Sequence, residues 1–221
     1  MQATTGVSRR KILALLGVGG AAGLAAACGN IVQGASSPSK TGSGASSAAT
    51  SGSTSVATSA TASGVETWLY LSIITGKQDG DSGYPEFLPA IFSVPANATV
   101  HAEIRCFDDG PAAVPSGYNN VKGTVGGTMT VISAVNGDLS TAKTQTVQSI
   151  DASNVAHTMT FADTGLNIPI PPLSTVRFDF LSGPAGSHGW QCMAACGSGT
   201  GGWGGPMATA GFMQGTMTVQ A

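Results

Sequence analysis

Gly189-Trp190-Gln191-Cys192-Met193-Ala194-Ala195-Cys196-Gly197 is the stretch that says most about this chain of 221 residues. Its two cysteines stand four residues apart, and glycines at both ends favour a tight loop. Two thiolates held on one loop are soft ligands, which suit copper better than magnesium or calcium. The same two cysteines could instead form a disulfide, because neighbouring thiols oxidise readily outside the cytosol. The stretch therefore leaves two interpretations open, a metal site and a cross-link.

Further soft donors stand on either side of this stretch. His157 opens a predicted strand upstream, where a partly buried imidazole needs a hydrogen-bond partner or a metal. Met207 and Met213 follow the cysteines, although methionine in an apolar β domain is often only core filler. We predict His157, Cys192 and Cys196 as the primary metal ligands, with Met207 or Met213 as a weak axial donor. Trp190 and Trp203 are expected to cover the site.

The same part of the chain has the pattern of an all-β domain. Short β-branched and aromatic runs recur between clusters of Gly, Pro, Asn and Asp, which predicts a sandwich or a closed barrel. The predicted strands are residues 65–75, 87–95, 99–107, 127–135, 144–150, 157–163, 174–181 and 212–221. In the third of these, alternation places Cys106 on the apolar face, as an inert buried thiol.

The first 63 residues have the composition of a targeting signal followed by a flexible linker. Arg9 and Arg10 precede an apolar run in the manner of a twin-arginine export signal, and Cys28 ends that run as in a bacterial lipobox. We therefore expect residues 1–28 to be a lipoprotein signal and Cys28 to be lipidated, which would anchor the protein to the cell membrane outside the cytoplasm. Ordinary cleavage and secretion is the alternative. Residues 29–63, rich in Ser, Gly, Ala and Thr, read as a disordered linker.

The folded domain is expected to span residues 64–221, and it is acidic. This segment holds all eleven carboxylates of the chain but only five of its nine cations, giving a net charge of −6. Phosphate repulsion argues against a nucleic-acid partner. A basic redox protein, or a copper donor or acceptor, remains compatible with that charge.

The domain resembles a cupredoxin, and within that superfamily the copper-binding domain of cytochrome c oxidase subunit II. The residues that carry the resemblance are 92–96 with Val100, 156–161, 167–171, 190–197, and 206–207 with 211–219. It implies a Greek-key β-sandwich. It also implies copper held by His157, Cys192, Cys196, the backbone carbonyl of Ala194 and a methionine.

The resemblance is incomplete at one position. The family's second histidine would fall at Thr200 here, so a mononuclear copper site is expected rather than a dinuclear one. His188 and His101 are interpreted as exposed residues, and Asp108-Asp109-Gly110 as a turn. The sequence thus predicts an exported electron-transfer or copper-handling protein, not an enzyme. The resemblance adds, by analogy, a variant of this prediction in which the protein is an accessory of a terminal oxidase. The alternative is a metal-free binding module with a Cys192–Cys196 disulfide.

Overall fold

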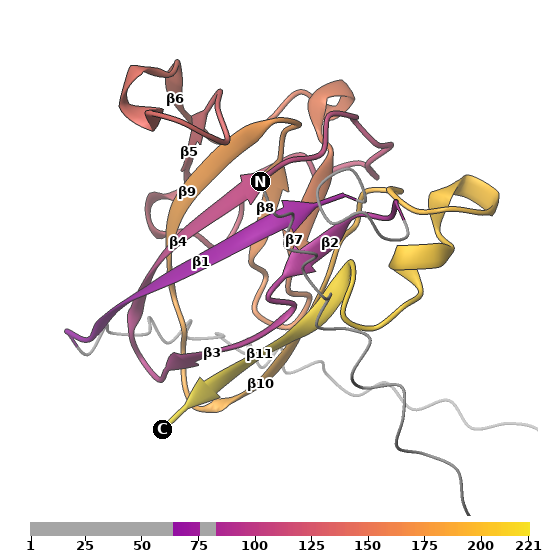
Figure 1. Cartoon of the computed structure of the whole chain (residues 1–221). Coiled ribbons are helices and arrows are strands. Elements are labelled where there is room, and N and C mark those ends of the chain that lie inside the picture. The colour runs from indigo at the N-terminus through magenta and orange to yellow at the C-terminus, as the bar shows by residue number, and fades with distance from the viewer. Residues whose placement is uncertain (1–63, 76–82) are drawn as a thin grey trace, which may run out of the picture. The chain divides into compact units, whose positions relative to one another are not determined.

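Two β-sheets build the protein in the computed structural model, which describes residues 64–75 and 83–221 (Figure 1). The first sheet has six strands in the order β2-β1-β4-β9-β5-β6. Their bounds are β1 Glu66–Ile74, β2 Glu86–Leu88, β4 Thr99–Cys106, β5 Met129–Ile132, β6 Thr144–Val147 and β9 Ser174–Leu181. The second sheet has five strands in the order β3-β11-β10-β7-β8. Their bounds are β3 Ile91–Pro95, β7 His157–Thr160, β8 Asn167–Ile170, β10 Gly186–Gln191 and β11 Gln214–Gln220.

The prediction of an all-β sandwich is confirmed. Within the described ranges, the helical segments are all three-residue 3₁₀ turns: Val125–Gly127, Leu139–Thr141, Ala152–Asn154, Thr200–Gly202 and Gly205–Met207. None of the helices found there is long and apolar enough to cross a membrane. The predicted export signal, with Arg9 and Arg10, the lipidation site Cys28 and the linker lie outside the described residues.

The core between the sheets follows the alternation seen in the sequence. On β4, Val100, Ala102, Ile104 and Cys106 are all buried, because period-two alternation points them to the same face. β4 is fixed on both sides, since it pairs with β1 in parallel and with β9 in antiparallel register. This strand ends at Cys106, and the chain that follows it runs directly to the candidate metal site.

The sequence misplaced some strands. The extended run at 87–95 is two strands that belong to different sheets, and the break contains Pro89, which has no N–H to donate to a ladder. β8 and β10 were not predicted as strands. β10 is rich in glycine and serine and lacks the β-branched residues that mark a strand, so backbone pairing with β11 along its whole length defines it.

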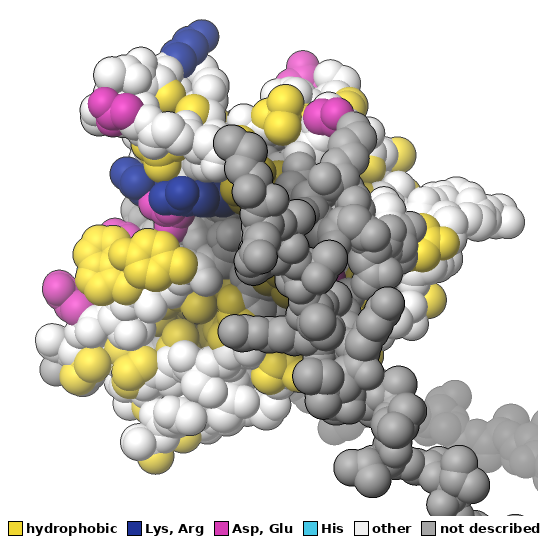
Figure 2. All heavy atoms as spheres, in the orientation of Figure 1, with side chains coloured by type: hydrophobic (Ala, Val, Ile, Leu, Met, Phe, Trp, Pro, Cys, Tyr) yellow, Lys and Arg dark blue, Asp and Glu magenta, His cyan; other side chains and the backbone are white. Residues whose placement is uncertain are grey.

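The outer face of β1 carries two exposed aromatic rings. Trp68 is 67% exposed and Tyr70 is 62% exposed, and their planes are only 10° apart with centroids 6.3 Å from each other. Figure 2 shows an apolar patch over β1 with acidic and basic side chains at its border. Close by in the sheet, Glu103 is buried and accepts hydrogen bonds from Arg105 at 2.7 Å and Arg177 at 2.8 Å.

Candidate metal site

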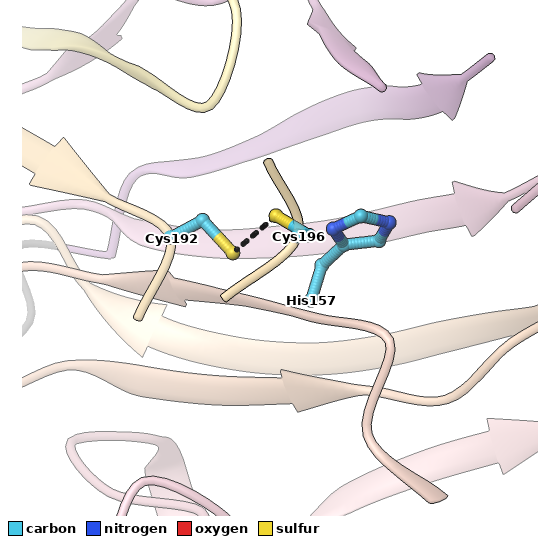
Figure 3. Close-up of side chains that lie close together, drawn as sticks. All are labelled: His157, Cys192 and Cys196. Carbon is cyan, nitrogen blue, oxygen red and sulfur yellow. Dashed lines mark hydrogen bonds between the residues drawn. The ribbon is translucent and has the colours of Figure 1, made fainter. Parts of the chain in front are cut away.

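Two distant parts of the sequence meet at one end of the sandwich. His157 is the first residue of β7, Cys192 follows the last residue of β10, and Cys196 lies in the next loop (Figure 3). One ligand atom from each residue lies within 4.8 Å of the others, and the two sulfurs are 3.5 Å apart. His157 and Cys192 are fully buried and Cys196 is partly buried. The structure therefore brings together the three primary ligands predicted from the sequence.

The His157 ring is held through only one of its nitrogens. Nε2 lies 3.0 Å from Oδ2 of Asp108, whereas Nδ1 is buried and has no hydrogen-bond partner. In Figure 3 one ring nitrogen faces the sulfur of Cys196 and the other points away from it. A buried nitrogen without a partner is costly unless something binds it. Nδ1 is thus the donor atom that this site offers to a metal.

Burial and charge act in opposite directions on the His157–Asp108 pair. Burial alone would lower the pKa of His157, but the Asp108 carboxylate and the Cys192 sulfur outweigh it and raise the pKa to about 9. For Asp108, burial alone would raise the pKa, but the hydrogen bond and charge of His157 hold it below its usual value. The metal-free site therefore favours an ion pair that fixes the orientation of the ring.

The two cysteines have different electrostatic surroundings. Burial opposes ionisation of Cys192, yet the hydrogen bond from Cys196 and the positive charge of His157 lower its pKa well below the usual value. The backbone N–H of Thr158 also points at the Cys192 sulfur, at 3.3 Å. The pKa of Cys196 is raised, chiefly because it donates its proton toward Cys192. Cys192 is thus prepared as the thiolate, which is the form that binds metals.

A third sulfur reaches this group from the glycine-rich loop. The Sδ atom of Met207 lies 3.3 Å from the Sγ atom of Cys196, and Met207 is buried. The loop packs tightly beneath it, since a Cβ placed on Gly197 would be 2.8 Å from Cγ of Met207. The glycine-rich loop between Cys196 and Met207 therefore returns the chain to the cysteine sulfurs.

Met213 contacts the same region through its backbone. Its carbonyl accepts a hydrogen bond from the N–H of Cys192 at 2.8 Å, and its side chain is part of the buried core. The Ala194 carbonyl lies beside the sulfurs, 3.6 Å from Sγ of Cys192, and accepts the N–H of Cys196 at 2.8 Å. Of the two predicted axial methionines, Met207 is the one whose sulfur is observed beside a predicted ligand.

The two tryptophans expected over the site differ in their surroundings. Trp190 is buried, packs edge-on against Phe87 with ring centroids 4.6 Å apart, and donates Nε1–H to the carbonyl of Ala90 at 3.0 Å. These contacts anchor the ring on the β2–β3 side of the sandwich. Trp203 remains 42% exposed, on the loop between Cys196 and Met207.

Two histidines differ from their interpretation as simple exposed residues. His188 is not in a turn but on β10, where Nδ1 lies 2.7 Å from Asp163. His101 is partly buried on β4 and lies 2.8 Å from Asp179 and against the ring of Trp68. Each imidazole already has a carboxylate partner, which argues against His188 serving as a second imidazole ligand.

Sequence reasoning missed the most important supporting residue. Asp108 was interpreted only as part of a turn, and it does bond the N–H of Gly110 at 3.1 Å, but its other oxygen holds His157. Its distance of 49 residues from His157 left no local signal. Thr158 was missed too, because its role depends on its backbone N–H, which no side-chain pattern reveals.

The donor set fits a soft metal. One imidazole nitrogen and two thiols lie within 4.8 Å of one another, and the thioether of Met207 lies 3.3 Å from one of these thiols. Asp108 holds the imidazole by a hydrogen bond to its other nitrogen, as carboxylates do for metal-binding histidines. Zinc and copper both accept such nitrogen and sulfur donors, and the weak thioether favours copper. The unpartnered Nδ1 atom of His157 is consistent with a bound cation at this place.

No protein-family model matches this chain, and no curated protein matches it. Among solved structures, auracyanin B is similar, with 11% identity, coverage of 70% of this chain and 89% of that chain, and a TM-score of 0.30. Rusticyanin from Thiobacillus ferrooxidans has 14% identity, coverage of 72% and 79%, and a TM-score of 0.31. A copper-containing nitrite reductase from Thermus scotoductus has 10% identity, coverage of 71% and 31%, and a TM-score of 0.27.

Proposed function

We propose that this protein binds one copper ion at His157, Cys192 and Cys196, with Met207 as a fourth, weaker donor, and carries electrons at the cell envelope. The observation that carries this proposal is the buried, unpartnered Nδ1 atom of His157 facing two sulfurs within 4.8 Å. When bound there, copper would supply a one-electron redox couple. The protein's own part is to hold the donors rigidly in a dry pocket, so that little rearranges between oxidation states.

Copper handling is a second function of the same site. The observation that favours it is the number of sulfurs, since Cys192, Cys196 and Met207 form a continuous group with neighbouring contacts of 3.5 Å and 3.3 Å. Soft thiolate and thioether donors select Cu(I). A carrier of this kind would exchange copper with a donor or acceptor protein. A measured redox potential and a Cu(I) affinity distinguish it from an electron carrier.

The metal-free alternative uses the same two cysteines. Their sulfurs are 3.5 Å apart and both thiols are free, so a small movement of the loop would bring them to bonding distance. The protein would then be a β-sandwich binding module with a disulfide that stiffens the loop. In this alternative Nδ1 of His157 has no metal to bind.

The location and the physiological role belong to the proposal as well. The twin-arginine pattern at Arg9 and Arg10 and the lipobox-like Cys28 support export and a lipid anchor, with plain secretion as the alternative. The resemblance to oxidase subunit II supports a role as an accessory of a terminal oxidase, and only by analogy. The basic redox partner follows from the net charge of −6 over residues 64–221.

A copper titration of the reduced full-length chain tests the proposal. We expect saturation at one copper per chain, a thiolate-to-copper absorption band, and protection of two thiols from alkylation. His157→Ala should abolish tight binding, whereas His101→Ala, which changes a histidine on β4, should leave it unchanged. The appearance of a Cys192–Cys196 disulfide without metal uptake would favour the alternative.

A further inference from the structure

A groove crosses the outer face of the five-stranded sheet. Each strand of that sheet contributes to its wall, and its cavity volume is about 830 Å³. Ile91 at the wall is 70% exposed, and the groove also borders the nearly completely buried core residues Phe161, Leu166 and Trp190. Small-molecule sites typically have volumes of about 300–1,000 Å³ and mainly apolar walls. The groove therefore has the size and the lining of a site for a small organic molecule.

A glycine on β10 keeps this groove open. Gly189 lies on the wall, and a Cβ placed on it would meet no atom within 4 Å. Its neighbour on β11 is Thr216, which also lines the groove. A larger side chain at position 189 would therefore project into the hollow without disturbing the strands. This makes residue 189 a natural place to block the groove.

The groove has a single charged lining residue among those that the structure describes, and that residue is a lysine. Lys122 is held at the wall by two backbone hydrogen bonds to Asn167, each 3.0 Å long. The side chain of Asn167 is already satisfied by Thr160 and by the carbonyls of Tyr118 and Asn120. The described part of the lining therefore includes one cationic residue and no carboxylate, which favours an anion over a cation.

The groove is adjacent to the candidate metal site. Gln191 and Met193 line it, and Cys192 stands between them in the chain. The Thr160 hydroxyl on the wall lies 2.9 Å from the Thr158 hydroxyl, which accepts the N–H of Met193 at 2.8 Å. The N–H of Thr158 in turn points to the Cys192 sulfur at 3.3 Å. A molecule in the groove would touch residues that position this sulfur.

We propose that this groove binds a small apolar organic anion, and that its occupancy is sensed at Cys192. The first part stands on the groove alone. The second part rests on the proposed copper site.

Fluorescence titration of the full-length chain with anilinonaphthalene sulfonate, an apolar anion, tests the first part. We expect one saturable site from which decanoate displaces the dye. Gly189→Leu should weaken binding by about tenfold or more, because it fills the hollow. Lys122→Gln should weaken it about threefold to fivefold, as expected for an exposed charge. Ser187→Leu, on the same face of β10 but outside the groove, is the matched control and should change nothing.

Three results would overturn this part. The first is dye binding that neither Gly189→Leu nor Lys122→Gln changes. The second is displacement of the dye by decanol as effectively as by decanoate. The third is that the dye does not bind and decanoate instead changes the self-association of the chain. Lys122→Gln keeps the test decisive if Gly189→Leu does not fold, because it changes only a surface side chain.

The copper-loaded protein tests the second part. Decanoate should shift the thiolate-to-copper absorption band of the unchanged protein and leave that of Gly189→Leu in place. A band that does not move while the dye is displaced would refute sensing at Cys192. Loss of copper binding with intact dye binding would instead refute the proposed function and leave the groove as a ligand site.

Discussion

The carboxylate of Asp108 lies 3.0 Å from Nε2 of His157 and leaves Nδ1 of the same ring without a partner. Asp108 follows β4 in the six-stranded sheet, whereas His157 begins β7 in the five-stranded sheet. One hydrogen bond between the two layers thus decides which nitrogen faces the sulfurs of Cys192 and Cys196. Asp108 acts through His157 and is therefore a positioning residue.

Replacing Asp108 should weaken metal binding without removing any predicted ligand. We expect Asp108→Ala to lower copper affinity about 10-fold to 100-fold, the usual effect of losing such a supporting partner. A competition titration against a copper chelator measures this. Asp179→Asn is the matched control, because Asp179 pairs with His101 at 2.8 Å away from the site. Equal effects of the two changes would mean that the His157–Asp108 pair has no special role.

The two methionines should respond differently to the same substitution. Met207→Leu removes the sulfur that lies 3.3 Å from Cys196, so we expect copper to remain bound with an altered absorption spectrum and a higher redox potential. Met213→Leu should change the free energy of unfolding by less than about 1.5 kcal/mol and leave the spectrum in place. Spectral change in the Met213 variant alone would assign the axial position to Met213.

The close packing of Gly197 provides a test of the loop. A Cβ at this position would overlap the carbonyl of Gly204 and lie 2.8 Å from Cγ of Met207. We expect Gly197→Ala to reduce the free energy of unfolding by about 1–3 kcal/mol, as overpacking does, and to displace Met207. Denaturant unfolding with and without copper measures both effects. Gly189→Ala, which meets no atom within 4 Å, is the control and should be tolerated.

Glu103 should make stability depend on acid pH. Burial alone would raise its pKa, but the hydrogen bonds and charges of Arg105 and Arg177 hold the pKa below the usual value. Because the folded-state pKa is lowered, the stabilisation is complete above the unfolded-state pKa and is lost as pH falls through the folded-state pKa. We expect the free energy of unfolding to decline below about pH 5, less steeply in Glu103→Gln.

At neutral pH, Glu103→Gln should cost about 1–2 kcal/mol, because hydrogen bonds to charged groups are lost. Urea unfolding curves from pH 7 down to acid pH measure both quantities. Parallel stability profiles for the two proteins would contradict the assignment.

Much of the fold, and part of the candidate metal site, could be predicted from local sequence patterns. Alternation on β4 correctly placed Ile104 and Cys106 in the core, and the soft donor types singled out His157, Cys192 and Cys196. These signals are local, because side-chain period and ligand chemistry can be recognised in a few residues.

The rest depended on contacts between distant segments. β10 is a strand because β11 pairs with it, although its glycine-rich sequence indicates a turn. Asp108 supports His157 across 49 residues, and Met207 reaches Cys196 only after a tightly packed glycine loop. No local pattern encodes such approaches, since they follow from how the two sheets pack.

X-ray absorption at the copper edge of the loaded full-length protein tests the central claim most directly. The account predicts one copper with two sulfur neighbours at bonding distance and one imidazole, and loss of the imidazole signal in His157→Ala. A copper surrounded only by nitrogen and oxygen, or a spectrum identical in His157→Ala, would contradict it.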